Sequence, residues 1–166
     1  MKKKYAALIF CAIGLLLGSV TSEAKKKPSV TAESAIVMDV QSGAILYEKN
    51  IDKREYPASI TKVMTALVAI ENSSLSETVT YSRNAVTKLE SGASNIEIQP
   101  GEKLSMEDSL YAILLMSANE ACNGVAEHVA GSIDNFVAMM NQKAKELGCT
   151  GTNFANANGL WMSNHY

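Results

Sequence analysis

The chain has 166 residues, of which 47% are hydrophobic and 19% charged, and its formal net charge is −2. This composition is typical of a globular protein and excludes a disordered polar chain, and the lack of basic excess argues against a nucleic-acid partner. The length favours one domain, and no apolar run of about twenty residues follows the N-terminal region, which excludes a multi-span membrane protein.

The first 24 residues read as an export signal. Three lysines at positions 2–4 precede an almost unbroken apolar stretch over residues 5–20, and Ser22 and Ala24 are small residues suited to signal peptidase cleavage. An uncleaved anchor helix is the alternative, although the apolar stretch is short for spanning a bilayer. We therefore expect a signal peptide over residues 1–24 and a protein that acts outside the cytoplasm.

The expected mature chain opens with a polar, proline-containing linker over residues 25–33. Apolar runs at 34–40 and 44–47 flank Gln-Ser-Gly at 41–43, which predicts a β-hairpin.

A helical period follows the hairpin, and its apolar residues predict a buried helix face made of Ile60, Val63, Met64, Leu67 and Val68. Residues 72–103 are rich in Ser, Asn, Thr and Gly, which predicts short elements and loops.

Three helices are predicted in the second half of the chain. Ser105 and Asp108 have the spacing of a capping box, which predicts a helix through residue 116. Residues 119–130 and 132–147 read as two further helices, each followed by a glycine. With the hairpin, this order gives an α/β chain.

Two cysteines, Cys122 and Cys149, remain after the expected signal peptide. A disulfide is possible outside the cytoplasm, but two small apolar core residues are the simpler interpretation. The chain contains no Cys-x-x-Cys, so we expect neither a zinc site nor any other metal or cofactor.

The segment YPASITKVMTAL at residues 56–67 carries the strongest chemical signal. Ser59 falls at the start of the predicted helix and Lys62 one turn later on the same face. A partly desolvated lysine there would have a lowered pKa and could accept the proton of a neighbouring hydroxyl. Ser59 as a helix cap and Lys62 extending to solvent remain the structural alternative.

A second signal is Ser117-Ala118-Asn119, which lies at the junction of two predicted helices. A hydroxyl and an amide two residues apart in such a link can face one cleft. Helix capping by Ser117 and Asn119 is the alternative.

Together these two segments resemble the serine-type D-alanyl-D-alanine carboxypeptidases, the low-molecular-mass penicillin-binding proteins of peptidase family S11. The resemblance covers AIVMDVQSGAILYEKN, YPASITKVMTAL, SANEACNGVAEHVAGS and GCTGTNFANANGLWMSNHY in that order, from about residue 34 to 166. It implies a β-lactamase/transpeptidase-like fold and a hydrolase of peptidoglycan stem peptides. It also implies that β-lactams acylate the same serine.

The resemblance assigns a role to each of the four residues. Ser59 would be the acylated nucleophile and Lys62 its proton acceptor. Ser117 would relay a proton to the leaving group, and Asn119 would bind the peptide amide of the substrate.

The family's third motif, Lys-Thr-Gly, is absent from the chain. The resemblance implies that this motif completes the oxyanion hole and holds the substrate carboxylate, so we expect residues 34–166 to be the N-terminal part of such a domain. The C-terminal strands of its sheet would then be missing, as would any C-terminal membrane anchor. One lost oxyanion donor costs about a hundred- to a thousandfold in rate, so activity of the chain alone would be low.

Two alternative functions remain. One is a β-lactamase or transpeptidase of the same superfamily, and the other is a non-catalytic fragment.

Overall fold

A computed structural model describes residues 28–87, 89–90 and 92–166. The expected signal peptide, residues 1–24, lies outside the described residues. The chain divides into two compact units at the boundary between Ile51 and Asp52, and each unit is described by itself.

The first unit contains the predicted β-hairpin. Strand β1 (Ala35–Met38) pairs antiparallel with β2 (Ile45–Lys49), and the register shifts after Val37. The turn is closed by Asp39, whose carboxylate accepts hydrogen bonds from the backbone N–H and the hydroxyl of Ser42 at 2.8 and 2.5 Å. Part of the expected linker lies against this unit, because the carbonyls of Val30 and Ala32 accept hydrogen bonds from Lys49 Nζ.

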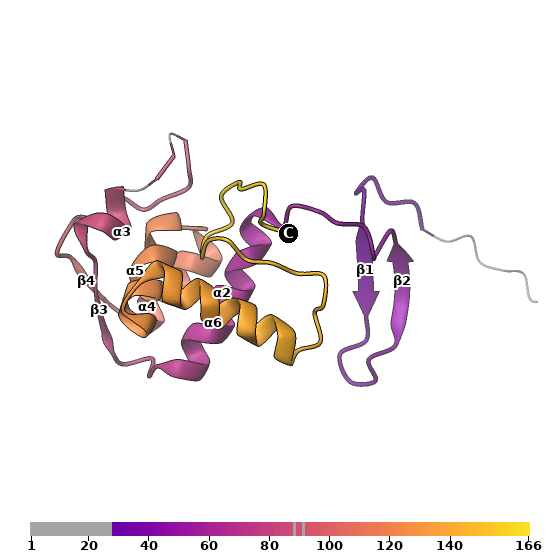
Figure 1. Ribbon diagram of the computed structural model, residues 1–166, viewed down its shortest axis with the longest axis horizontal. Helices are drawn as coiled ribbons and strands as arrows, with labels where there is room; N and C mark the ends of the chain where they lie inside the picture. The colour runs from indigo at the N-terminus through magenta and orange to yellow at the C-terminus, as the bar shows by residue number, and fades with distance from the viewer. Residues whose placement is uncertain (1–27, 88, 91) are drawn as a thin grey trace, which may run out of the picture. The chain divides into compact units, whose positions relative to one another are not determined.

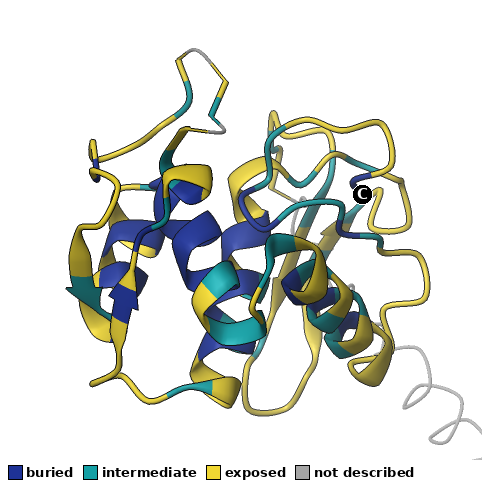
Figure 2. Cartoon of the chain, turned by 60° about the vertical axis from the view of Figure 1, so that its left-hand side comes forward, coloured by how far each residue is buried: buried dark blue, intermediate teal, exposed yellow. Residues whose placement is uncertain are grey.

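The second unit is mainly helical, with α5 at its centre (Figures 1 and 2). Helix α5 contacts α2, α3, α4, α6 and strand β3, so its residues are buried on most sides, as the dark blue helical segments in Figure 2 illustrate. In chain order the elements are η1 (Ala58–Ile60), α2 (Thr61–Asn72), β3 (Thr78–Thr80), α3 (Arg83–Thr87), β4 (Lys103–Ser105), α4 (Met106–Leu115), α5 (Asn119–Ala130) and α6 (Ile133–Glu146). Strands β3 and β4 form a second antiparallel pair.

The helix ends follow the capping residues that the sequence predicted. Ser105 caps α4 by accepting a hydrogen bond from the backbone N–H of Asp108 at 3.0 Å, and Ser132 caps α6 in the same way. Helix α5 ends at Gly131, whose φ of +75° belongs to the left-handed region that favours glycine.

The predicted buried face of α2 is wrong in part: Val68 is buried, Met64 is half-buried against the core and Leu67 is half-buried, but the other two residues are exposed. Ile60 and Val63 are 74% and 63% exposed, and of the five predicted residues only Val68 is buried. The face that packs against α4, α5 and α6 is built from small and polar side chains instead: Thr61, Lys62, Thr65, Ala66, Val68 and Ala69. Small residues permit close helix packing, and buried hydroxyls are tolerated where they find acceptors, as Thr65 does in the carbonyl of Ala157 at 2.6 Å.

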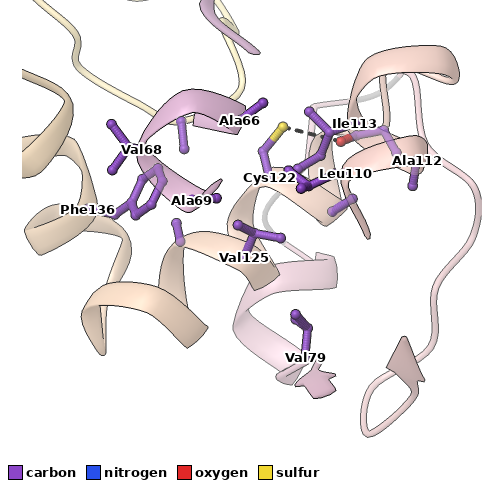
Figure 3. Close-up of a cluster of buried hydrophobic side chains, with 14 of the residues drawn as sticks. Ala66, Val68, Ala69, Val79, Leu110, Ala112, Ile113, Cys122, Val125 and Phe136 are labelled. Carbon is purple, nitrogen blue, oxygen red and sulfur yellow. Dashed lines mark hydrogen bonds between the residues drawn. The ribbon is translucent and has the colours of Figure 1, made fainter. Parts of the chain in front are cut away.

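The hydrophobic core of this unit lies where α2, α4, α5 and α6 meet (Figure 3). Cys122 lies within it, fully buried, with its thiol directed at the carbonyl of Ala118 (Figure 3). Cys149 is exposed, so the expectation of two core cysteines holds for Cys122 only. Cys149 follows the end of α6, where the chain leaves the core, and both thiols are free.

Glycine at position 124 is required by close packing between α5 and Tyr81. A Cβ at this position would lie 2.3 Å from Cε1 of the Tyr81 ring, which is itself fully buried and hydrogen-bonded to Ser109. The ring has no room to retreat, so a methyl group overpacks the core.

We expect Gly124→Ala to lower the free energy of unfolding by about 1–3 kcal/mol in urea titrations, although alanine favours helix formation. Gly151→Ala is the matched control, because a Cβ there meets nothing within 4 Å. Equal stability of the two variants would contradict the packing argument.

Candidate active site

Ser59 lies in a short 3₁₀ turn, η1, directly before helix α2. The preceding residue, Ala58, has a φ of +48°, a conformation that costs an alanine of the order of 1 kcal/mol or more. Such strained residues cluster at functional sites, where the surrounding structure holds them in place. Here the strain accompanies a serine hydroxyl presented at the protein surface.

Lys62 is buried one helical turn after Ser59, with only 3% of its surface exposed. Its Nζ lies 3.3 Å from Ser59 Oγ, 2.9 Å from Asn119 Oδ1 and 2.7 Å from the carbonyl oxygen of Asn158. These three oxygens come from three separate parts of the chain. The predicted alternative, a Lys62 side chain that extends to solvent, is therefore not what the structure has.

The three contacts fit both protonation states of the lysine: an ammonium donates to all three oxygens, and a neutral amine donates to two of them and accepts from the third. An uncharged lysine nitrogen has two N–H groups and one lone pair. Asn119 Oδ1 and the Asn158 carbonyl can only accept, so they take the two N–H groups. The lone pair is then left for the hydroxyl proton of Ser59.

Burial lowers the pKa of Lys62 below its ordinary value, because desolvation disfavours the charged form. The Cys122 thiol is the neighbouring titratable group that acts on this lysine. Burial raises the pKa of Cys122 to about 12, so the thiol stays neutral at ordinary pH and does not compete as a counter-ion.

Ser117 lies between α4 and α5 and Asn119 opens α5, at the helix junction that the sequence predicted. Ser117 has a φ of +55°, a second strained position, and its hydroxyl donates a 3.0 Å hydrogen bond to Ser59 Oγ. Asn119 is the first residue of α5, and its side-chain amide donates to the carbonyl of Ser94 at 2.9 Å. The structure thus brings all four predicted residues together from segments nearly sixty residues apart.

Asn158 is a contact that the sequence did not predict. It contributes a backbone carbonyl, which no side-chain pattern marks. The neighbouring Gly159 carried the available signal: its φ is +85°, and a Cβ there would lie 1.9 Å from the carbonyl oxygen of Ala58. Only glycine allows the segment to approach the Ser59 turn this closely.

A second polar contact holds the same C-terminal segment against α2. The ring of His165 accepts a hydrogen bond from the backbone N–H of Ala155 through Nδ1, so its Nε2–H donates to Thr61 Oγ1 at 2.7 Å. Burial lowers the pKa of His165, which favours this neutral form. Thr61, the residue before Lys62, is therefore fixed by a hydrogen bond to His165.

The arrangement places an exposed serine hydroxyl beside a buried lysine nitrogen. A cavity of about 430 Å³ shares Asn158 with the site, but none of Ser59, Lys62, Ser117 and Asn119 lines it. Within residues 28–87, 89–90 and 92–166, no three His, Cys, Asp or Glu side chains are grouped as metal ligands.

The chain is similar to known proteins over most of its length. The family model described as D-alanyl-D-alanine carboxypeptidase matches residues 21–166. The chain is 35% identical to D-alanyl-D-alanine carboxypeptidase DacF of Bacillus subtilis over 99% of its length, and 37% identical to DacC of Escherichia coli over 80%. Penicillin binding protein 5 of Haemophilus influenzae superimposes with a TM-score of 0.78 at 33% identity, over 85% of the chain.

The chain spans less than half the length of these relatives: 44% of DacF, 35% of DacC and 42% of the Haemophilus protein. Solved structures similar to the chain include a D-alanyl-D-alanine carboxypeptidase, penicillin-binding proteins and a DD-transpeptidase, so the expected α/β, β-lactamase-like fold class is confirmed, and the chain contains part of that fold. From the family match and these relatives, the chain belongs to the D-alanyl-D-alanine carboxypeptidase family, peptidase family S11.

Proposed function

We propose that the chain carries the nucleophile half of a serine-type D-Ala-D-Ala carboxypeptidase, a penicillin-binding hydrolase of peptidoglycan stem peptides. The observation that carries the proposal is the buried Lys62 amine, whose third contact is the Ser59 hydroxyl at 3.3 Å. The names of the relatives supply the substrate class, and the cluster supplies the chemistry.

In the proposed first step, Ser59 Oγ attacks the carbonyl carbon of the penultimate D-alanine. The O–H bond breaks as the Oγ–C bond forms, and the proton passes to Lys62 Nζ. When the C–N bond breaks, the proton held by Lys62 passes through the Ser117 hydroxyl, which lies 3.0 Å from Ser59 Oγ, to the leaving D-alanine nitrogen. Water then hydrolyses the ester.

Asn119 has two parts in this proposal. Its Oδ1 holds Lys62 through a 2.9 Å hydrogen bond, and the family resemblance gives its side chain the role of binding the peptide amide of the substrate. A β-lactam ring presents a comparable carbonyl, so it would acylate Ser59 in the same way.

Peptidoglycan lies outside the cytoplasmic membrane, so this substrate fits the expected signal peptide at residues 1–24 and the proposed domain over residues 34–166. Within the described part of the chain, no helix has the length and apolar character needed to cross a bilayer. Membrane association through a segment beyond residue 166 stays a proposal.

Benzylpenicillin tests the nucleophile directly. We expect the 166-residue chain to gain one penicilloyl adduct per molecule by intact mass, and Ser59→Ala to gain none. Ser163→Ala, an exposed serine outside the cluster, is the matched control and should acylate like the unmodified chain. An unmodified mass in a folded chain would reject Ser59 as an acylated residue here, and steady consumption of penicillin would favour the β-lactamase alternative.

The pH dependence of acylation tests Lys62. A general base acts only when unprotonated, so the rate should rise with pH and reach a plateau above the lowered pKa of Lys62. The Lys62→Arg variant keeps its proton at every accessible pH, and we expect its acylation rate to fall by about 10²- to 10⁴-fold.

Lys145→Arg, at an exposed position on α6, serves as the control and should leave the profile unchanged. A rate independent of pH in the unmodified chain, or full acylation of Lys62→Arg, would show that another group takes the Ser59 proton.

A further inference from the structure

Glu120, on the first turn of α5, is buried to 99% beside the candidate active site. Its Oε1 accepts a 2.6 Å hydrogen bond from the backbone N–H of Ile96, while its Oε2 has no hydrogen-bond partner among the described residues. A buried carboxylate with an unsatisfied oxygen costs stability, so packing alone gives a poor account of a glutamate here.

The segment that Glu120 holds also contacts Asn119. The carbonyl of Ser94, two residues before Ile96, accepts hydrogen bonds from both the backbone N–H and the side-chain Nδ2 of Asn119, at 3.0 and 2.9 Å. Three hydrogen bonds therefore tie residues 94–96 to the first two residues of α5. Two of them end on Asn119, and the third ends on Glu120.

The Ser94 carbonyl decides which way the Asn119 amide faces. Because this carbonyl can only accept, Nδ2 must point to it, and Oδ1 is left to face Lys62 Nζ at 2.9 Å. In the opposite orientation Nδ2 would face the lysine and would donate to its lone pair. That lone pair is the one needed by the Ser59 hydroxyl.

We propose that Glu120 is a positioning residue for acylation: its hydrogen bond to Ile96 holds the Ser94 carbonyl in place, and this carbonyl fixes the Asn119 amide with its oxygen toward Lys62. The inference rests on the proposed function of Ser59 and Lys62, and it assigns a role to a side chain that touches neither of them. The relay from Glu120 to the lysine nitrogen consists of three hydrogen bonds: Ile96 N–H to Glu120, Asn119 Nδ2 to the Ser94 carbonyl, and Lys62 Nζ to Asn119 Oδ1.

The test compares three substitutions of Glu120 in the full chain. Alanine removes the acceptor, aspartate retracts the carboxylate by one methylene, and glutamine keeps a carbonyl oxygen in the same place. We expect the first-order acylation rate constant with benzylpenicillin to fall about tenfold or more for Glu120→Ala and Glu120→Asp. Glu120→Gln should stay within about threefold of the unmodified chain, and the dissociation constant for penicillin should change little.

The pH profile separates positioning from general stability. Losing the Asn119 oxygen removes an acceptor from protonated Lys62, which lowers its pKa further. The midpoint of the profile should therefore move to lower pH, with a lower plateau, in Glu120→Ala and Glu120→Asp. A variant that is merely less stable keeps the midpoint of the unmodified chain.

Glu97→Ala is the matched control, because Glu97 lies on the same segment with its side chain exposed. We expect it to keep both the rate constant and the midpoint. If Glu120→Ala does not fold, the comparison of Glu120→Asp with Glu120→Gln carries the same test, and an equal rate loss in those two variants would overturn the hydrogen-bond relay.

A readout without penicillin makes the two proposals distinguishable. In NMR spectra, the Ile96 backbone amide should exchange with solvent faster in Glu120→Asp than in the unmodified chain, and the Asn119 side-chain amide resonances should shift. Unchanged exchange and unchanged resonances would overturn the positioning role even if Ser59 is acylated. Failure of the unmodified chain to acylate, with the expected NMR changes present, would instead count against the proposed function alone.

Discussion

The hydrogen bonding of one buried lysine nitrogen is the constraint on which the second unit depends. Lys62 has 3% exposure, and burying an ammonium or amine is costly unless its polar contacts are provided inside the protein. The structure provides them from three places: Ser59 before α2, Asn119 at the start of α5, and the carbonyl of Asn158. Each of these segments must lie within hydrogen-bond distance of Lys62 Nζ. This requirement restricts how α2, α5 and the C-terminal segment pack.

Several otherwise unrelated features follow from this requirement. Gly159 has no side chain, which lets the C-terminal segment approach the Ser59 turn. Thr61 and Thr65, on the face of α2 that carries Lys62, bind that same segment through His165 and the Ala157 carbonyl. The positive φ angles of Ala58 and Ser117 fall beside the Ser59 hydroxyl and at Ser117 itself, the residues where the reaction is proposed, and backbone strain of this kind clusters at functional sites. The unit thus gives up stability at the places where chemistry is proposed.

Much of the local structure could be predicted because local signals determine it. Ser105 and Ser132 cap helices through bonds to residues three positions ahead, and Gly131 supplies the left-handed residue that ends α5. The four candidate residues were found because two short motifs occur in the order of a known family. The family and fold class are confirmed by the comparisons, while the catalytic roles of these residues stay predictions.

The missed features depend on tertiary contacts that have no periodic signature. The apolar period of α2 predicted that Ile60 and Val63 face the core, but the helix packs through its threonines, alanines and lysine. Asn158 acts through its backbone and Glu120 acts through Ile96 of a loop, so neither contact could be predicted, although both residues lie in segments that resemble the family. Hydropathy patterns assign polar residues to the surface. This rule fails for polar side chains that are buried in the candidate site.

The most direct test of this account is the pKa of Lys62 itself, measured by NMR on the chain with isotopically labelled lysine side chains. The Lys62 resonance, assigned by its loss in Lys62→Arg, should titrate below the ordinary lysine value of 10.5, because burial disfavours the charged amine. A Lys62 that titrates at or above 10.5 would contradict the account, because the nitrogen would then be a solvated or ion-paired ammonium with no lone pair for Ser59.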